Sequence, residues 1–314
     1  MNVLSLFDGI SCAKIALDNL GVEINNYYAS EIDPYAIKVS NINHPDIINL
    51  GDIRKIQPGI LPEIDLLIGG SPCQDLSNAQ KGLGLNGKKS GLFYDYIRLL
   101  KAINPRYFLL ENVKNKWGNL MSEYVGIDYV EISSAKFSAQ SRPRYYWTNI
   151  DYANIPPENH NTQLNDIIEG QVDEKYYLRN PRVDEFLKNN SVANKKPTKE
   201  GIVKALQLPR EIHNDHDRQR RVYALSSKSP TLLARADTTK ILHQGRVRKL
   251  TPIECERLQG IPDNYTQICS DTQRYKIIGN AFTVQVIEHL LSGLNKRPFQ
   301  KKIKKSISMF EGCK

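Results

Sequence analysis

The stretch IDLLIGGSPCQDLS, residues 64–77, indicates the architecture of the chain. Its first five residues form an apolar run typical of a buried strand, and the two glycines that follow let the backbone turn sharply. Pro72 stiffens the backbone just before Cys73. A thiol at a strand end lies where open α/β sheets bind their ligands. A lone cysteine in this setting is more often structural, so the role of Cys73 depends on the other motifs.

Strand-like and helix-like segments alternate on both sides of this stretch. Strands are expected at residues 3–7, 27–32, 64–68, 107–110, 129–133 and 144–150. Helices are expected at residues 12–20, with Ser11 as cap and Gly21 at the end, from Asp33-Pro34 onward, at 91–103 and at about 283–294. This rhythm predicts an α/β, Rossmann-like fold, with a mostly parallel sheet and helices on both faces.

The rhythm stops after Asp151. Residues 153–245 are polar, rich in Asn, Lys and Arg, and only weakly periodic. Capping-box patterns at residues 251–254 and 270–273 then predict that helices resume. We therefore expect one domain formed by residues 1–152 and 250–314, and a smaller, irregular domain at 153–249.

Composition narrows the class of protein. The 314 residues include five cysteines without a CxxC pair, which favours a reducing compartment over a disulfide framework or a zinc cluster. We expect no signal peptide, because the N-terminus lacks a basic segment and a long apolar core, and no apolar run is long enough to span a bilayer. The net charge of +9 favours a polyanionic partner such as nucleic acid, although a basic solvated surface explains it equally well.

Several polar residues follow expected strands, where a nucleotide-like ligand would bind. Phe7-Asp8-Gly9 forms a strand, a tight turn and a helix start, although an ordinary βα turn has the same pattern. Glu31 ends the second strand and suits ribose hydroxyls. Asp52 is suited to accept a hydrogen bond from an adenine amino group, or is a turn residue.

Three further motifs carry charged or amide side chains. Glu111, in an apolar strand end, should have a raised pKa and suits a general acid, unless it pairs with Lys114. Arg142 and Arg144 flank a proline and can direct guanidinium groups to a base carbonyl or a phosphate. Asn280, in the turn before the last helix, reaches a ligand carboxylate or simply caps the helix.

The order of these motifs is more informative than any one of them. Phe-Asp-Gly, Pro-Cys-Gln, Glu-Asn-Val, Gln-x-Arg-x-Arg, a Leu-Thr-Pro helix and Gly-Asn-Ala follow one another along nearly the whole chain except residues 153–245. This series resembles the C5-cytosine-specific DNA methyltransferases, in particular their compact, Dnmt3-like, phage and bacterial branch. One departure is Ser11, where many members have a second glycine; serine is small enough for cofactor binding to be kept.

The resemblance implies a covalent mechanism on a cytosine that is flipped out of the duplex. The Cys73 thiolate attacks C6, and C5 then takes a methyl group from S-adenosyl-L-methionine, leaving S-adenosyl-L-homocysteine. Glu111 holds the N3 side of the base, while Arg144, and secondarily Arg142, face its O2. A lid from about Asp75 to Leu92 closes over the site.

The resemblance also implies a cofactor site and a set of partners. The cofactor-binding residues it indicates are Phe7, Asp8, Gly9, Glu31, Ile32, Asp52, Ile53, Pro72, Leu92, Asn280 and Ala281. Residues 153–249 become a target-recognition domain for double-stranded DNA. We expect a cytoplasmic monomer of a bacterium or phage-infected cell, of the kind found in restriction-modification systems, without metal or membrane.

Three alternatives stay open at this stage. A catalytically silent relative would bind DNA only, but Cys73, Glu111 and both arginines are all present. An RNA methyltransferase of the same fold would carry a Cys-Phe-Thr signature, which this chain lacks. A nicotinamide-dependent Rossmann enzyme would leave the Pro-Cys-Gln motif unexplained.

Overall fold

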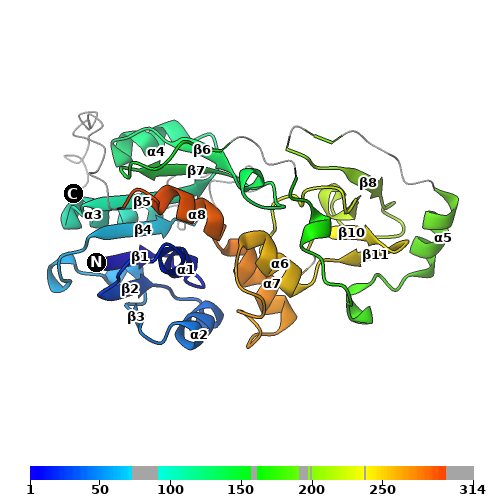
Figure 1. The fold of residues 1–314 in the computed structure, drawn as a ribbon, viewed down its shortest axis with the longest axis horizontal. Helices are drawn as coiled ribbons and strands as arrows, with labels where there is room; N and C mark the ends of the chain where they lie inside the picture. Colours follow the sequence, from blue (N-terminus) through cyan, green and yellow to red (C-terminus); the bar gives the residue numbers. More distant parts are fainter. Residues whose placement is uncertain (73–90, 157–160, 191–196, 199, 237, 295–314) are drawn as a thin grey trace. The chain divides into compact units, whose positions relative to one another are not determined.

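The computed structural model describes residues 1–314 except 73–90, 157–160, 191–196, 199, 237 and 295–314 (Figure 1). The chain forms two compact units. The first comprises residues 1–132, 143–154 and the chain from 287 onward; the second comprises 133–142 and 155–286. The predicted lid and Cys73 itself lie outside the described residues.

The first unit contains a seven-stranded sheet in the order β3-β2-β1-β4-β5-β7-β6. Its strands are β1 (Asn2–Leu6), β2 (Asn26–Ser30), β3 (Ile48–Asn49), β4 (Leu66–Gly70), β5 (Tyr107–Val113), β6 (Val130–Ser133) and β7 (Pro143–Thr148). Neighbouring strands are parallel from β3 through β2, β1 and β4 to β5. The next strand, β7, is antiparallel to β5. The predicted Rossmann-like, mostly parallel sheet is confirmed. The two-residue edge strand β3 was not expected, because it has no strand-length pattern.

Alternation along β1 explains how the sheet is covered. Leu4 and Leu6 join an apolar cluster with Phe93 and Tyr96 of α3 (Leu92–Ile103) and Met121 of α4 (Gly118–Val125). Side chains on a strand alternate between faces, so Val3 and Ser5, also buried, point to the other side. Figure 1 shows α1 (Cys12–Asn19) and α8 (Val284–Leu291) in front of the strands.

The helices differ in whether a side chain accepts hydrogen bonds from the free amides of the first turn. In α2 (Pro34–Asn43), the Asp33 side chain accepts hydrogen bonds from the Tyr35 and Ala36 amides, as predicted. Ser11 precedes α1 but its side chain makes no capping bond. Its hydroxyl is instead hydrogen-bonded to Asp8 and Ser40, so the predicted cap is wrong.

The second unit is more regular than its sequence suggests. It contains a four-stranded sheet in the order β11-β10-β9-β8, formed by β8 (Lys204–Gln207), β9 (Arg221–Tyr223), β10 (Lys240–His243) and β11 (Arg246–Lys249). Helices α5 (Pro181–Asn189), α6 (Pro252–Gln259) and α7 (Asp271–Asn280) belong to the same unit. Most of the described residues in 153–249 lie outside helices and strands, but the small sheet was not predicted, because strands of three or four residues that carry Lys and Arg leave no readable alternation.

Helix α6 is attached to β11 of the second unit by a buried ion pair. Glu254 and Arg248, both fully buried, form a two-bonded ion pair at 2.7 and 2.8 Å. Glu254 also completes the predicted capping box with Thr251, which is confirmed. The second capping box is wrong, since the Ser270 side chain makes no capping bond at the start of α7.

The two compact units can be set beside the expected domains, whose bounds stay a prediction. The first unit ends at Asn154, close to the expected residue 152. The chain returns to it only at Ile287, not at residue 250, so α6 and α7 group with the second unit. Residues 133–142, which include Arg142, also lie in the second unit.

One glycine of the central sheet tests how tightly β1 and β4 pack. A Cβ on Gly69 would lie 2.7 Å from the Leu6 carbonyl oxygen and 3.3 Å from the Tyr96 ring. Because backbone cannot yield as a side-chain end does, Gly69→Ala should destabilise the protein by about 1–3 kcal/mol. We expect a melting temperature lower by roughly 2–4 °C per kcal/mol in thermal unfolding.

Gly59→Ala is the matched control, since nothing lies within 4 Å of a Cβ there. Equal melting temperatures for the two variants would show that β1 and β4 can separate at no cost.

Candidate active site

The predicted cofactor residues of the first unit lie at one edge of the sheet. Phe7 follows β1, Glu31 follows β2, and Pro72 comes shortly after β4. Because β2, β1 and β4 are parallel neighbours, their carboxyl ends meet at the same edge. Phe7 and Leu92, at the start of α3, both pack against the apolar cluster under this edge. The structure thus brings together residues that are far apart in sequence.

The loop between β1 and α1 has an unusual backbone. Phe7, Gly9 and Ser11 all have positive φ, at 56°, 61° and 62°. This left-handed region favours glycine, and other residues adopt it at a cost of roughly 1–2 kcal/mol. It explains why glycine is frequent at the Ser11 position in the family that the sequence resembles. Here the Ser11 hydroxyl offsets the cost through its bonds to Asp8 and Ser40, both at 2.6 Å.

Asp8 supports this loop from inside the protein. One of its carboxylate oxygens accepts a hydrogen bond from Ser11 and the other accepts one from Tyr27, at 2.6 and 2.8 Å. Only 7% of the residue is exposed. Burial raises the pKa of Asp8 to about 6, against the smaller opposing effect of its hydrogen bonds. Asp8 therefore shapes the loop through buried contacts.

Glu31 connects this loop to the end of β2. Its Oε2 accepts a hydrogen bond from the Gly9 amide at 2.8 Å, and its Oε1 accepts from the amides of Ile32 and Asp33 at 2.7 and 2.8 Å. The neighbouring Ile32 side chain is 67% exposed. A fixed carboxylate beside an exposed apolar side chain suits a ligand with hydroxyl groups next to a flat ring.

Asp52 and Ile53 lie at the start of a short 3-10 helix after β3. Three hydrogen bonds from the Arg54 side chain, reinforced by one from its amide, lower the pKa of Asp52 to about 2. The carboxylate is therefore ionised at neutral pH and can only accept. Ile53 is buried in the apolar cluster, so its side chain faces away from solvent.

Glu111 and Arg144 form an ion pair between β5 and β7. The Glu111 Oε1 atom lies 2.8 Å from Arg144 Nε, and the two side chains are 13% and 11% exposed. The expected apolar setting of Glu111 is wrong, as is its alternative partner, because Lys114 binds Glu131 instead. A carboxylate held by one edge of a guanidinium keeps its second oxygen available for another donor.

Asn112 is a residue whose role the sequence did not reveal. It is fully buried, and its amide donates to the Ser71 carbonyl and hydroxyl oxygens at 3.1 and 2.8 Å. These bonds attach β5 to the backbone that leads into Pro72 and Cys73. Only its position between Glu111 and Val113 could have indicated this role in the sequence. An asparagine whose amide points inward from a strand is otherwise not distinguishable there.

Arg142 lies in the second unit, where it supports the Gly-Asn-Ala turn. It is 6% exposed and donates to the carbonyl oxygens of Leu232, Gly279 and Ala281 at 3.3, 3.1 and 3.0 Å. Asn280, between the last two, is exposed at the end of α7. Arg142 is thus a buried support of the backbone around Asn280, which differs from the base-facing role expected for it.

Two glutamines, also missed in sequence, extend this buried network. Gln140 Nε2 donates to Gln259 Oε1 at 3.0 Å, and its Oε1 accepts from the Leu232 amide at 2.9 Å. Gln259 Nε2 donates to the Ile278 and Ala281 carbonyl oxygens at 3.0 and 3.2 Å. The Gln-x-Arg motif, the end of α6 and the Gly-Asn-Ala turn therefore form one hydrogen-bonded group.

Comparisons with known proteins agree on one family. A family model described as C-5 cytosine-specific DNA methylase matches residues 1–296. The type II methyltransferase M1.ScrFI of Lactococcus lactis subsp. cremoris is 32% identical, over 94% of this chain and 79% of its own length. M.HhaI of Haemophilus parahaemolyticus is 28% identical, over 95% and 97%. The crystal structure of S. pombe Dnmt2 methyltransferase shares the fold, with a TM-score of 0.65 at 17% identity, over 94% and 98%.

Fold, motif order and these matches define an S-adenosylmethionine-dependent class of methyltransferase. The chain belongs to the C-5 cytosine-specific DNA methylase family. Its reaction is the methylation of cytosine at C5 in DNA. In the described part of the chain, no helix is long and apolar enough to cross a membrane. The same residues contain no group of three or more His, Cys, Asp or Glu placed to hold a metal ion.

The buried carboxyl group of Asp8 predicts a pH-dependent change in stability. Its pKa rises from 3.8 to about 6 on folding, so its contribution to stability is complete below pH 3.8 and is lost as the pH rises through 6. Asp8→Asn removes this loss. We expect the stability of the variant relative to wild type to increase by up to about 3 kcal/mol between pH 4 and 7.

Denaturant unfolding at several pH values measures this difference. Any constant offset from altered hydrogen bonds cancels, since only the pH-dependent part is compared. A difference that stays flat from pH 4 to 7 would show that Asp8 ionises like an exposed carboxyl group.

Proposed function

We propose that this protein methylates a cytosine that is flipped out of double-stranded DNA, with Cys73 as nucleophile and Glu111 and Arg144 holding the base. The observation that carries the proposal is the Glu111–Arg144 ion pair. Glu111 lies on β5, which pairs with β4, and the chain after β4 leads to Cys73. N3 and O2 of cytosine both accept hydrogen bonds: the Arg144 guanidinium can donate to O2, and Glu111 can serve N3 once a proton lies between them.

The chemistry requires activation of an aromatic ring. The Cys73 thiolate forms a bond to C6, and the electron pair of the C5–C6 double bond moves toward C5. Negative charge then grows on N3 and O2: a proton held between Glu111 and N3 neutralises it on the N3 side, and the Arg144 guanidinium stabilises it at O2. The electron pair at C5 then forms the bond to the methyl group. The Arg144 guanidinium has five N–H donors, so one edge can hold Glu111 while another reaches O2. Loss of the C5 proton and of the thiolate restores the aromatic ring.

Asn112 gives Cys73 a fixed starting point. Both its bonds go to Ser71, two residues before the nucleophile. Pro72 leaves the intervening backbone little freedom. We assign Asn112 as a positioning residue, which acts on the thiol through the backbone without touching the base.

The residues at the sheet edge fit S-adenosylmethionine. Glu31 would accept hydrogen bonds from the ribose hydroxyls, Ile32 would contact the adenine ring, and Asp52 would accept from the adenine amino group. Phe7, Gly9, Pro72 and Leu92 would line the same edge, and Asp8 and Ile53 would support it from below. The bound cofactor supplies an electrophilic methyl group for C5. Asn280 and Ala281 complete the proposed set from the second unit.

We assign target recognition to the second unit, with the segment at 153–249 as its DNA-binding part. This segment provides the basic four-stranded sheet, and the relatives named above are DNA methyltransferases. S-Adenosylmethionine as cofactor, a monomeric state and a cytoplasmic site of action are parts of the same proposal.

The nucleophile is tested by Cys73→Ser. The variant should transfer no tritium from labelled S-adenosylmethionine to unmethylated genomic DNA, because a serine hydroxyl is not ionised at neutral pH. Cofactor affinity, measured by calorimetry, should match wild type. Only wild type should form an SDS-stable adduct with DNA containing 5-fluorocytosine.

A parallel reaction with transfer RNA separates the DNA enzyme from an RNA enzyme of the same fold. Turnover by Cys73→Ser, or labelling of RNA alone by wild type, would contradict the proposed function.

The two arginines of the Gln-x-Arg-x-Arg motif should respond differently to Arg→Lys exchange. Lysine keeps the charge but cannot bind several acceptors in one plane. Arg144→Lys should lower kcat by about 10²-fold or more, with cofactor affinity kept. Arg142→Lys should weaken cofactor binding, since the turn around Asn280 loses its support, and lower the melting temperature.

Single-turnover rates at saturating cofactor distinguish the two variants. Restored rates for Arg142→Lys under saturation support a positioning role. The same loss of single-turnover rate in both would instead place both side chains at the base.

A further inference from the structure

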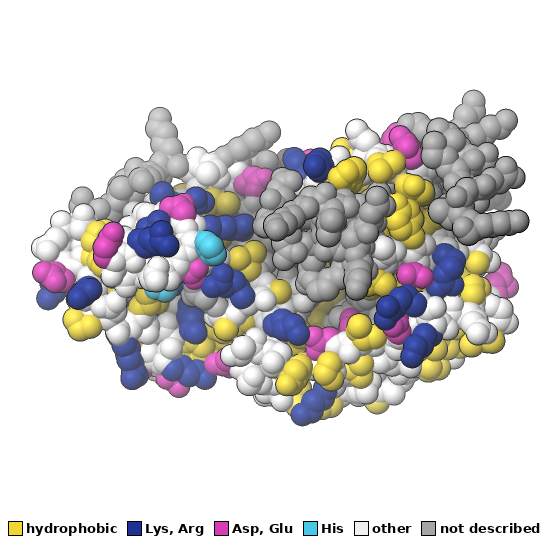
Figure 2. Space-filling model, turned by 180° about the vertical axis from the view of Figure 1, so that it is seen from behind, with side chains coloured by type: hydrophobic (Ala, Val, Ile, Leu, Met, Phe, Trp, Pro, Cys, Tyr) yellow, Lys and Arg dark blue, Asp and Glu magenta, His cyan; other side chains and the backbone are white. Residues whose placement is uncertain are grey.

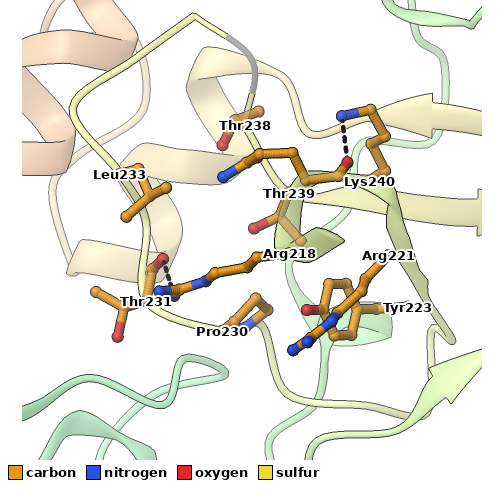
Figure 3. A pocket seen from close by; sticks show the side chains of 10 residues that line it. Arg218, Arg221, Tyr223, Pro230, Thr231, Leu233, Thr238, Thr239 and Lys240 are labelled. Atoms are coloured by element: carbon orange, nitrogen blue, oxygen red, sulfur yellow. Dashed lines mark hydrogen bonds between the residues drawn. The ribbon is translucent and has the colours of Figure 1, made fainter. Parts of the chain in front are cut away.

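The second unit contains a small basic pocket that the cofactor and catalytic sites do not use (Figure 3). It is shallow, since the centre of a water molecule can reach only about 20 Å³ of it. The lining comes from the 3-10 helix Asp217–Arg220, strands β9 and β10, and the segment between them. The residues are Arg218, Gln219, Arg221, Tyr223, Pro230, Thr231, Leu233, Thr238, Thr239 and Lys240.

Three cationic side chains line this pocket, and they differ in exposure and in their hydrogen-bond partners. Arg218 is exposed and, among the described residues, makes one hydrogen bond, from Nη2 to the Thr231 carbonyl oxygen at 3.3 Å. Arg221 is 41% exposed and pairs with Asp217 at 2.8 Å. Lys240 is buried and donates to the Gln219 carbonyl oxygen at 2.9 Å. Arg218 and Arg221 therefore offer donors at the mouth, while Lys240 adds charge behind them.

The acidic groups nearby do not cancel this charge. Asp217 is bound by both Arg220 and Arg221, at 3.3 and 2.8 Å. Arg221, and to a smaller extent Arg220, lower the pKa of Asp217, so its carboxylate stays ionised. This single negative charge faces several positive ones and does not neutralise them all. Over residues 204–249 the sequence has eleven Lys and Arg but four Asp and Glu. In the view of Figure 2, Lys and Arg side chains lie on both halves of the molecule, with Asp and Glu among them.

The remaining wall supplies hydroxyl and apolar groups. Thr239 contributes a hydroxyl, whereas the Thr231 hydroxyl donates to the Ser141 carbonyl oxygen at 2.8 Å. Pro230, Leu233 and the Tyr223 ring contribute apolar surface. Arginine forks combined with threonine hydroxyls are the usual protein partners of phosphate oxygens. Donors dominate here, which suits an oxyanion, whereas the edges of adenine and cytosine would require an acceptor as well.

We propose that this pocket binds a backbone phosphate of the DNA, with Arg218 and Arg221 as the direct ligands. The proposal rests on the proposed function, because it takes the second unit as the DNA-binding unit. A phosphate contact carries no sequence information but fixes the register of the protein on the duplex. Such a contact would fix the position of segment 230–236, which lies between β9 and β10, relative to the DNA backbone.

The test measures the salt dependence of DNA binding. Anisotropy titrations use a random-sequence 30-base-pair duplex and purified full-length protein at several NaCl concentrations. Each phosphate contact contributes about 0.9 to the slope of log K against log salt. Arg218→Gln should lower that slope by about 1 and weaken binding at low salt by about tenfold. Arg218→Lys should keep most of the slope, since the charge remains.

Arg246→Gln is the matched control. Arg246 is a similarly exposed arginine of the same unit, 44% exposed, and is paired with Glu174 at 2.7 Å away from the pocket residues. It changes the net charge by the same amount, so an unchanged slope in this variant supports a specific phosphate contact. Equal losses of slope in Arg218→Gln and Arg246→Gln would overturn the proposal in favour of general charge attraction.

Two further measurements separate this proposal from the proposed function. Cofactor affinity and melting temperature should match wild type in all three variants, which shows that folding is intact. Failure of wild type to methylate DNA would contradict the proposed function, yet the slopes would still decide whether the pocket binds phosphate.

Discussion

The parallel pairing of β1 with both β2 and β4 is the constraint on which the first unit depends. Leu6 lies opposite Ser30 on one side and Gly69 on the other. This register places three strand ends, and the loops that follow them, at one edge of the sheet. This register requires glycine at position 69, because a side chain there would collide with the Leu6 carbonyl oxygen. The residues that we propose as cofactor ligands come from these loops, so their positions depend on one close backbone contact.

The second unit depends on buried polar groups that satisfy one another. Gln140, Arg142 and Gln259 bind main-chain oxygens or each other where no water reaches. A partly satisfied network of this kind costs more than an apolar core, so each member requires the others. Gly279 fits the same picture, since a Cβ there would lie 2.5 Å from the Leu233 carbonyl. The motifs shared with the family therefore encode backbone support as well as chemistry.

Sequence patterns predicted the sheet, the motif order and the cluster of strand-end residues, because these follow from local periodicity and from parallel topology. They did not predict what each polar side chain binds. Glu111 looked like a carboxylate in an apolar strand end, yet its partner Arg144 is more than thirty residues away. Asn112 and Gln259 looked ordinary because their acceptors are distant backbone carbonyls. The four-stranded sheet was missed since its strands are short and charged.

Arg142 and Arg144 belong to one motif but to different units of the structure. The resemblance to the family implied that Arg144, and secondarily Arg142, face O2 of the base. The strand β7 begins at Pro143, however, and Arg142 belongs to the preceding loop of the second unit. Only Arg144 follows the strand geometry, which places it beside Glu111. Two arginines on either side of one proline thus have different partners: Arg144 pairs with Glu111, and Arg142 holds the turn around Asn280.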